Sequence, residues 1–307
     1  MKNIIGKIVL ALGIWSCMAI AAAETTYWQE PCIPAPYDYS YQDDARAISI
    51  NHVLTNGLSY WVADVQIQDA ATMKTVLSDG STVSAMAQDT DAVLAINGDD
   101  YGTHSYGVIL RNGELLRAHD TTRHMLIVDS DGNMRLVRDR KANPYKALAE
   151  QLQSEQVWQA FEFGPALVEN GQALSFPDAF DVISTRPSRK EPRTAIGMIE
   201  PLHYVINVVD GRQPGYSDGI SLQDLQLLFQ DYGAQVAFNL DGADLRRCGL
   251  WEKSSAIPVA ARSAVFRISS AFKPQKGRTV LRTQRRKARL AQNSLSPDLG
   301  ERENRKP

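Results

Sequence analysis

"YVINVVDGRQPGYSDGISLQDLQLLFQDYGAQVAFNLDG", residues 204–242, has the pattern of a strand, a helix and a second strand in one run. Residues 204–209 are mainly apolar, which is typical of a buried strand. Residues 221–233 have helical spacing, with Ser221 suited to cap the helix and Gly233 to end it. Residues 234–240 are mainly apolar again. The stretch therefore predicts an α/β (α+β) fold, in which buried strands and a helix share one core.

The same analysis extends to the rest of the chain. Residues 47–67 have two alternating runs around "TNG", which predicts a hairpin. Short strands around "RNG" and "SDGN" predict a β-meander between residues 105 and 137, and residues 81–90 and 143–160 have helical patterns. Because no repeat or linker interrupts these elements, we expect a single domain with a mixed, largely antiparallel central sheet and flanking helices.

Composition excludes one class of partner. The chain has 307 residues, 44% of them hydrophobic, and a net charge of -2. Acidic and basic residues are interspersed up to about Ser270, so no basic surface for nucleic acid is expected there.

The N-terminus has the pattern of an export signal. Lys2 and Lys7 precede an apolar run that closes on alanines at positions 21–23. The run is short for a membrane span, which needs about 20 apolar residues, although an uncleaved anchor stays open as an alternative. We expect residues 1–23 to be removed, residues 24–46 to form an N-terminal extension, and the protein to be secreted or to reside in the cell envelope. Contact with a membrane is expected only through this signal.

Polar residues with glycine follow three apolar runs, and an arginine precedes a fourth. Any one of these segments is most simply a turn, because Asn-Gly and Asp-Gly are common turn dipeptides. Together they predict a site, since polar groups at strand ends line ligand crevices and glycine lets a substrate approach the backbone. The candidates are Asn97, Gly98 and Asp99, then Arg193, then Asp210, Gly211 and Arg212, and finally Asn239, Asp241 and Gly242.

Seven blocks in unbroken order resemble the phosphodiester glycosidase family. They are "ADVQI", "AVLAINGDDYG", "GVILRNGELLR", "FGPALVENG", "PRTAIG", "VVDGRQPGYSDGISLQDLQLLFQDYGA" and "AFNLDG". The resemblance covers residues 47–242 and implies a phosphodiester glycosidase domain over that range. It implies hydrolysis of a sugar-1-phosphodiester of the N-acetylglucosamine type, which releases a sugar and a phosphate monoester.

The resemblance also implies roles. Asp210 and Asp241 are candidates for nucleophile or general base, with Asn239 beside them, and Arg193 and Arg212 suit the phosphate because a guanidinium grips two of its oxygens. Asn97 and Asp99 would position sugar hydroxyls or carboxylates. Asp100 stands where related bacterial sequences usually carry an aromatic residue, so no role is given to it.

Cofactors and partners follow from the same residues. His104 and His119 show no metal-ligand spacing, and Cys32 and Cys248 define no disulfide framework. We expect no cofactor, although a divalent cation held by carboxylates stays open. The expected partner is a sugar-phosphodiester in a cell-wall or capsule polymer. A non-catalytic carbohydrate-binding or cell-wall-associated protein of the same fold is the alternative.

The family pattern stops after Gly242. The family continues with glycines, two serines and a hairpin, whereas this chain continues with "ADLRRCGLWEKSS". A legal back-translation with one added g in the run after the Asp241 codon gives d-g-g-g-s-s-t-v-w-f-m-g-k-v-i, which is the missing block. We therefore hypothesise that the domain is truncated at its C-terminal end and that residues 243–307 are an out-of-frame, disordered tail. On this hypothesis the chain as written lacks the final strand of the sheet and is poorly folded or inactive. A genuinely divergent C-terminus stays open as the alternative.

Overall fold

The computed structural model describes residues 28–77, 83–101, 105–139, 143–176 and 187–241, and the backbone of residues 265–269. The predicted export signal, His104 and Gly242 lie outside these residues. No helix among the described residues is long and apolar enough to cross a membrane.

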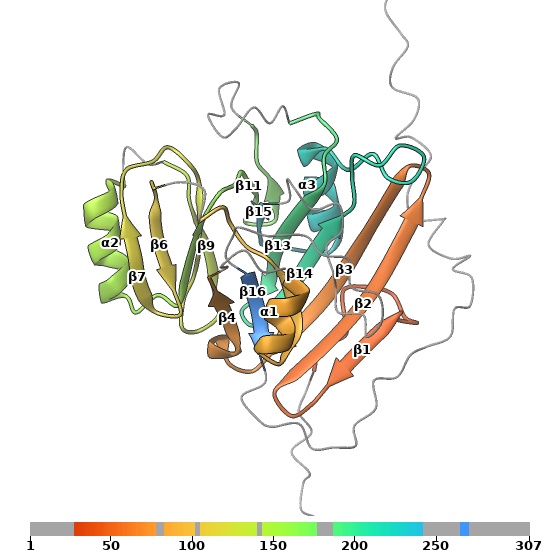
Figure 1. The fold of residues 1–307 in the computed structure, drawn as a ribbon, viewed down its shortest axis with the longest axis horizontal. Coiled ribbons are helices and arrows are strands. Elements are labelled where there is room, and N and C mark those ends of the chain that lie inside the picture. Colours follow the sequence, from red (N-terminus) through yellow and green to blue (C-terminus); the bar gives the residue numbers. More distant parts are fainter. Residues whose placement is uncertain are drawn as a thin grey trace, which may run out of the picture.

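An eight-stranded antiparallel sheet forms the centre of the molecule (Figure 1). Its strand order is β1-β2-β3-β14-β13-β15-β11-β12. These strands are β1 (Tyr39–Gln42), β2 (Arg46–Thr55), β3 (Leu58–Ile67), β14 (His203–Val209), β13 (Arg193–Glu200), β15 (Val236–Leu240), β11 (Ala166–Glu169) and β12 (Gln172–Ala173). The predicted hairpin is confirmed as β2 and β3, and β1 lies within the predicted N-terminal extension.

Two smaller sheets complete the strand structure. The first has the order β7-β6-β10-β8-β9 and contains β6 (Val108–Arg111), β7 (Glu114–Ala118), β8 (Met125–Val128), β9 (Met134–Val137) and β10 (Gln159–Glu162). β10 lies between the two predicted hairpins, so they do not form a continuous meander. The second has the order β4-β16-β5, with β4 (Met73–Val76), β5 (Ala92–Asn97) and β16 (Val265–Ser269). β16 lies within residues 243–307 and pairs with β4 and β5.

Among the described residues, three α-helices cover the sheets, and a 3-10 turn, η1 (Ala70–Thr72), precedes β4. The helices are α1 (Val83–Asp89), α2 (Tyr145–Ser154) and α3 (Leu222–Asp231). The prediction of a helix to residue 160 was wrong at its end, because Gln156 has a φ of 53° and residues from Gln159 onward form β10. α3 begins at its predicted cap, since the Ser221 hydroxyl accepts a hydrogen bond from the Asp224 amide.

The core lies on both faces of the large sheet. One cluster contains Ile196, Ile206 and Phe238 and includes residues of β5, β8 and β10. The other contains Ala195, Val205 and Ala237 and packs against α3. Figure 1 shows α2 on the outer face of the five-stranded sheet, away from the large sheet. With every described strand pair antiparallel and the helices on the outside, the single-domain α+β prediction is confirmed.

Candidate active site

The ends of four strands meet at one edge of the large sheet. Antiparallel pairing places Arg193 opposite Val209 and Thr194 opposite Leu240, so β13 begins where β14 and β15 end. β5 joins them, because the Asp241 amide donates to the Gly98 carbonyl at 3.0 Å. The Thr194 hydroxyl also donates to Asn97 Oδ1 at 2.7 Å. Segments far apart in sequence are therefore brought to one edge, although their register comes from antiparallel pairing and not from a parallel sheet.

Arg193 is the buried cation of this edge. Its side chain is 5% exposed, and its Nε has no hydrogen-bond partner among the described residues. Its Nη2 makes a long hydrogen bond to the Arg189 carbonyl at 3.4 Å. Burial lowers the pKa of Arg193 to about 10, with Glu191 acting against that shift. The guanidinium is still charged at neutral pH, so Arg193 is suited to receive an anion.

Arg212 is arranged differently from Arg193. Its Nε contacts Glu191 Oε2 at 2.6 Å, and its side chain is 52% exposed. Arg189 contacts the other oxygen of Glu191 at 2.5 Å. Arg212 is thus already paired to a carboxylate, and of the two predicted phosphate ligands only Arg193 is buried.

Asn239 lies on β15 and is almost fully buried. Its Nδ2 donates to the Gly164 carbonyl at 2.8 Å, whereas its Oδ1 has no partner among the described residues. A buried amide oxygen without a partner is destabilising unless water or a ligand donates to it. Asn239 therefore offers one acceptor at this edge.

Asp210 follows β14 and is tied to the β2–β3 hairpin. Its Oδ2 accepts hydrogen bonds from the Ser59 hydroxyl at 3.0 Å and the Tyr216 hydroxyl at 3.1 Å. Its backbone amide donates to the Ser59 carbonyl at 2.9 Å. Its Oδ1 makes no hydrogen bond within the described part of the chain, which leaves that oxygen for water or substrate.

Gly211 is required by close packing. A Cβ at this position would lie 2.5 Å from the Pro192 nitrogen. A side chain here would push the loop after β14 away from the start of β13, and with it Asp210 away from Arg193.

Asp99 and Asp100 are held in buried ion pairs. Both oxygens of Asp99 lie 2.6 Å from Arg111 Nη2, and Asp99 is fully buried. Both oxygens of Asp100 lie 2.8 Å from Arg123 Nη1. The Asp99 carboxylate is thus bound to a structural partner, and its contribution to the site is to fix the segment that carries Asn97 and Gly98.

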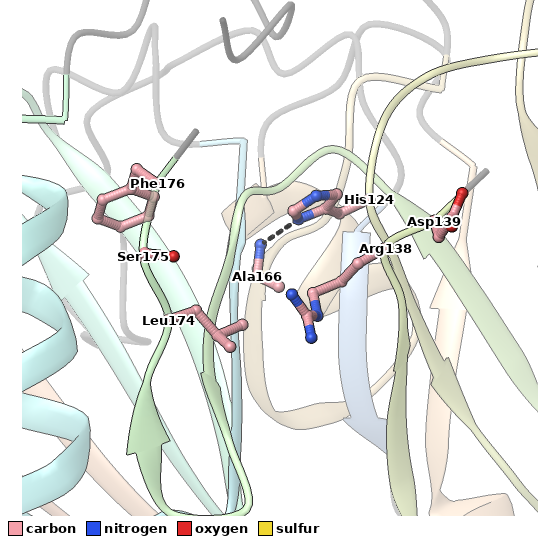
Figure 2. Close-up of a pocket in the computed structure, with 7 residues that line it drawn as sticks. All are labelled: His124, Arg138, Asp139, Ala166, Leu174, Ser175 and Phe176. Atoms are coloured by element: carbon pink, nitrogen blue, oxygen red, sulfur yellow. Dashed lines mark hydrogen bonds between the residues drawn. The ribbon is translucent and has the colours of Figure 1, made fainter. Parts of the chain in front are cut away.

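A cavity of about 290 Å³ opens beside the same edge (Figure 2). It is lined by His124, Arg138, Asp139, Ala166, Leu174, Ser175 and Phe176. Figure 2 shows His124 and Arg138 on one side and Leu174 and Phe176 on the other. The Ala166 amide donates to His124 Nδ1 at 3.2 Å, two residues from the Gly164 carbonyl that binds Asn239. The cavity combines apolar and polar walls, as sugar-sized ligands require.

Sequence reasoning missed several residues of this site. Ser59 and Tyr216 bind Asp210, Thr194 binds Asn97, and His124 lines the cavity. Only Thr194 carried a signal, because it follows Arg193 in "PRT". In the part of the chain that the structure describes, no three His, Cys, Asp or Glu side chains are grouped to hold a metal ion.

The family profile described as phosphodiester glycosidase matches residues 90–245 of the 307. The chain belongs to the phosphodiester glycosidase family. A search of curated proteins found no match.

Solved structures give the fold comparison. The catalytic domain of zebrafish N-acetylglucosamine-1-phosphodiester alpha-N-acetylglucosaminidase, auto-inhibited by its pro-peptide, is 19% identical with a TM-score of 0.54, over 73% of this chain and 83% of that one. A hypothetical protein from Synechocystis is 13% identical with a TM-score of 0.48, over 76% of this chain and 64% of that one. The likeness to the zebrafish domain supports the fold.

Proposed function

We propose that this family member is an exported hydrolase that cleaves the glycosidic bond of a sugar-1-phosphodiester, with an N-acetylglucosamine-1-phosphodiester as the type of substrate. The observation that carries the proposal is Arg193, a buried guanidinium with an unpaired Nε at the sheet edge that also holds Asp210, Asn239 and Asp241. A phosphodiester would supply an anionic partner for this guanidinium. The zebrafish enzyme is named after a substrate of this class.

The leaving group decides which chemistry the site must supply. A phosphate monoester leaves as a stabilised anion, so the main demands are to hold its charge and to support an oxocarbenium-like carbon. In our proposal Arg193 holds the phosphate, Asp210 activates water through its open Oδ1, and Asp241 stabilises the developing positive charge. Asn239 Oδ1 accepts a hydrogen bond from a sugar hydroxyl or amide.

The role proposed for Asp210 predicts inversion at the anomeric carbon. Water activated by Asp210 attacks the anomeric carbon directly, without a covalent glycosyl-enzyme intermediate, and one displacement inverts the configuration. We therefore expect the released sugar to have the inverted configuration, which NMR of the product before mutarotation would show.

The experiment that tests the function uses the chain with its reading frame restored after Asp241. This protein is incubated with an N-acetylglucosamine-1-phosphodiester, and released sugar and bound substrate are both measured. Turnover that disappears in Asp241→Asn, with unchanged folding, supports hydrolysis, because the amide cannot act as a carboxylate. Full activity in Asp241→Asn would remove this residue from the catalytic set.

A non-catalytic carbohydrate-binding role is the second candidate. The cavity beside Asn239 favours it, since a sugar could be held there without chemistry. Binding without turnover in the same experiment would select this role. In either case we propose that residues 1–23 direct export and that the ligand belongs to a cell-wall or capsule polymer.

Export has a direct test of its own. Material secreted from an expressing cell is expected to begin near residue 24, as N-terminal sequencing would show. Exported protein that still begins at Met1 would contradict cleavage.

A further inference from the structure

A chain of hydrogen bonds leads from Asp210 to the surface. Asp210 Oδ2 lies 3.0 Å from Ser59 Oγ, and Ser59 Oγ lies 2.9 Å from His52 Nε2. The Tyr216 hydroxyl lies 2.8 Å from Ser59 Oγ and 3.1 Å from Asp210 Oδ2. Ser59 is fully buried, whereas His52 is partly exposed. The carboxylate is therefore connected to a titratable ring that reaches solvent.

The sheet fixes this arrangement. β3 pairs with β14 so that Tyr60 lies opposite Val209, which places Ser59 beside Asp210. β2 pairs with β3 so that His52 lies opposite Trp61, and the two rings stack with centroids 4.2 Å apart and planes 14° apart. Figure 1 shows the loop after β14 close to the end of the β2–β3 hairpin. His52 and Ser59 precede residue 90, where the match to the family begins.

We propose that Ser59 and His52 form a proton relay that serves Asp210. In the hydrolytic step, water oxygen bonds to the anomeric carbon, the carbon–oxygen bond to phosphate breaks with its electron pair, and Asp210 takes one proton from the water. The proton arrives at Oδ1, so the carboxyl group turns to bring that proton to Ser59 Oγ. Asp210 then gives it to Ser59 Oγ while the Ser59 hydroxyl proton passes to His52 Nε2. The products are the Asp210 carboxylate, the Ser59 hydroxyl and an imidazolium at His52, which releases its proton to solvent.

The proposed reaction needs a path by which a proton can leave Asp210 for solvent. The phosphate monoester product has a second pKa of about 6, so above that pH hydrolysis yields one free proton for each turnover. Asp210 is only 8% exposed, and its Oδ2 faces Ser59 and Tyr216 rather than bulk water. Ser59 has a single proton to donate, and when it turns toward His52 the Tyr216 hydroxyl still donates to Asp210.

Several groups around His52 can influence its charge. The Asp38 carboxylate, which precedes β1, accepts from the His52 amide at 2.6 Å. Asp210 and the Tyr216 phenol face it through Ser59, and the indole of Trp61 stacks on its ring. Since Asp38 and Tyr216 are present in every variant below, changes that follow Asp210 and Ser59 report the relay itself.

The relay rests on the proposed function for its purpose, but its connection can be tested in the full chain without any substrate. NMR of the His52 imidazole, assigned with His52→Gln, would follow protonation in the unaltered chain, in Asp210→Asn, in Ser59→Ala and in the double variant. We expect Asp210→Asn to lower the midpoint of the His52 titration by about half a pH unit or more, because a carboxylate favours imidazolium. We expect that shift to fall by at least about half in the Ser59→Ala background. Equal midpoints in all four proteins would overturn the relay.

The kinetic test uses the frame-restored chain. His52→Gln keeps a hydrogen bond to Ser59 but cannot take up the proton, so kcat should fall about tenfold or more while KM stays within about twofold. His119→Gln, in an exposed loop, is the matched control.

Chemical rescue separates a relay from a merely structural role. His52→Ala removes the ring that stacks on Trp61, and added imidazole should restore part of kcat through the vacated space. Pyrrole has the same size but no basic nitrogen, and it should restore nothing.

Equal rescue by both compounds, or an unchanged kcat in His52→Gln, would overturn the relay while the hydrolytic function stands. A frame-restored chain that hydrolyses no sugar-phosphodiester would instead remove the proposed function, and the NMR experiment alone would then decide the connection.

Discussion

Arg193 is buried with an unpaired Nε, and a guanidinium in that state destabilises the fold unless an anion meets it. Its neighbour Arg212 is half exposed and held by Glu191. Arg193 precedes an apolar run in the sequence, whereas Arg212 follows another one. The loop that carries Arg212 packs against Pro192 through Gly211.

Substitution by lysine keeps the positive charge but removes the planar guanidinium, which can bind two phosphate oxygens at once. This change distinguishes the role of Arg193 from that of Arg212. Arg193→Lys should weaken kcat/KM for the phosphodiester by about 1.5 to 3 kcal/mol, roughly tenfold to a hundredfold, as for a lost hydrogen bond to a charged group. Arg212→Lys should cost less than about threefold, because the exposed side chain is already paired. An aryl glycoside without phosphate is the control substrate in the frame-restored chain. Equal losses on both substrates would assign Arg193 a structural role.

Single residues also show where sequence reasoning succeeds and where it stops. Asn97 and Asp210 could be singled out because each stands next to glycine at the end of an apolar run, and Asn239 because it lies near the end of such a run in "FNLDG". Ser59 could not, because its partner Asp210 lies 151 positions away and only the β3–β14 register joins them. His52 could not either, because it reaches Asp210 only through Ser59. Nothing in the alternating pattern of a strand indicates that one of its serines will bind a distant carboxylate.

At the scale of elements, periodicity predicted the hairpin and α3 well. It failed at the end of α2, since residues 155–158 keep an acceptable helical pattern while the backbone of Gln156 turns left-handed. Periodicity also could not predict the order of the strands in the sheets. β10 separates two hairpins that follow one another in sequence, because its backbone pairs with β6 on one side and with β8 on the other.

The segment before β1 is attached to the sheet by a buried cluster. Asp64 on β3 accepts from the Cys32 amide at 2.7 Å and from His203 Nε2 at 2.9 Å. Gln66 exchanges two hydrogen bonds with Gln29. Burial alone would raise the pKa of Asp64, but the bonds from His203 and Cys32 bring it below the ordinary value.

The sign of this shift gives a prediction for Asp64→Asn. A carboxyl whose pKa is lower in the folded state stabilises the fold above its unfolded value, about 3.9, and loses that contribution as pH falls through the folded value. The variant should lose about 3 kcal/mol at neutral pH and show a flatter decline from about pH 5 to pH 3. Urea unfolding across that range measures both. Asp44→Asn, at an exposed position, is the control, and a decline of equal steepness in Asp64→Asn would contradict the assignment.

At the scale of the whole molecule, the large sheet is complete without residues 243–307, whereas the three-stranded sheet takes its middle strand, β16, from them. Asp241 is the last described residue before the break in the family pattern. Most of the described fold was predictable from residues 47–242, because the family resemblance and the periodicity both extend over that range.

Restoring the reading frame tests the hypothesis for that segment. One g inserted into the run after the Asp241 codon should yield the glycine- and serine-containing block and a final strand with a matching apolar face. We expect the free energy of unfolding to rise by about 2 kcal/mol or more, since burying one or two further apolar side chains contributes at that scale. Turnover of the sugar-phosphodiester should appear together with this gain. The matched control inserts three g, which adds one residue and leaves the frame unchanged, and it should give neither effect.

A single insertion that lowers stability, with genomic resequencing that shows the original frame intact, would contradict the hypothesis. Residues 243–307 would then be native sequence, and β16 would belong to the native sheet.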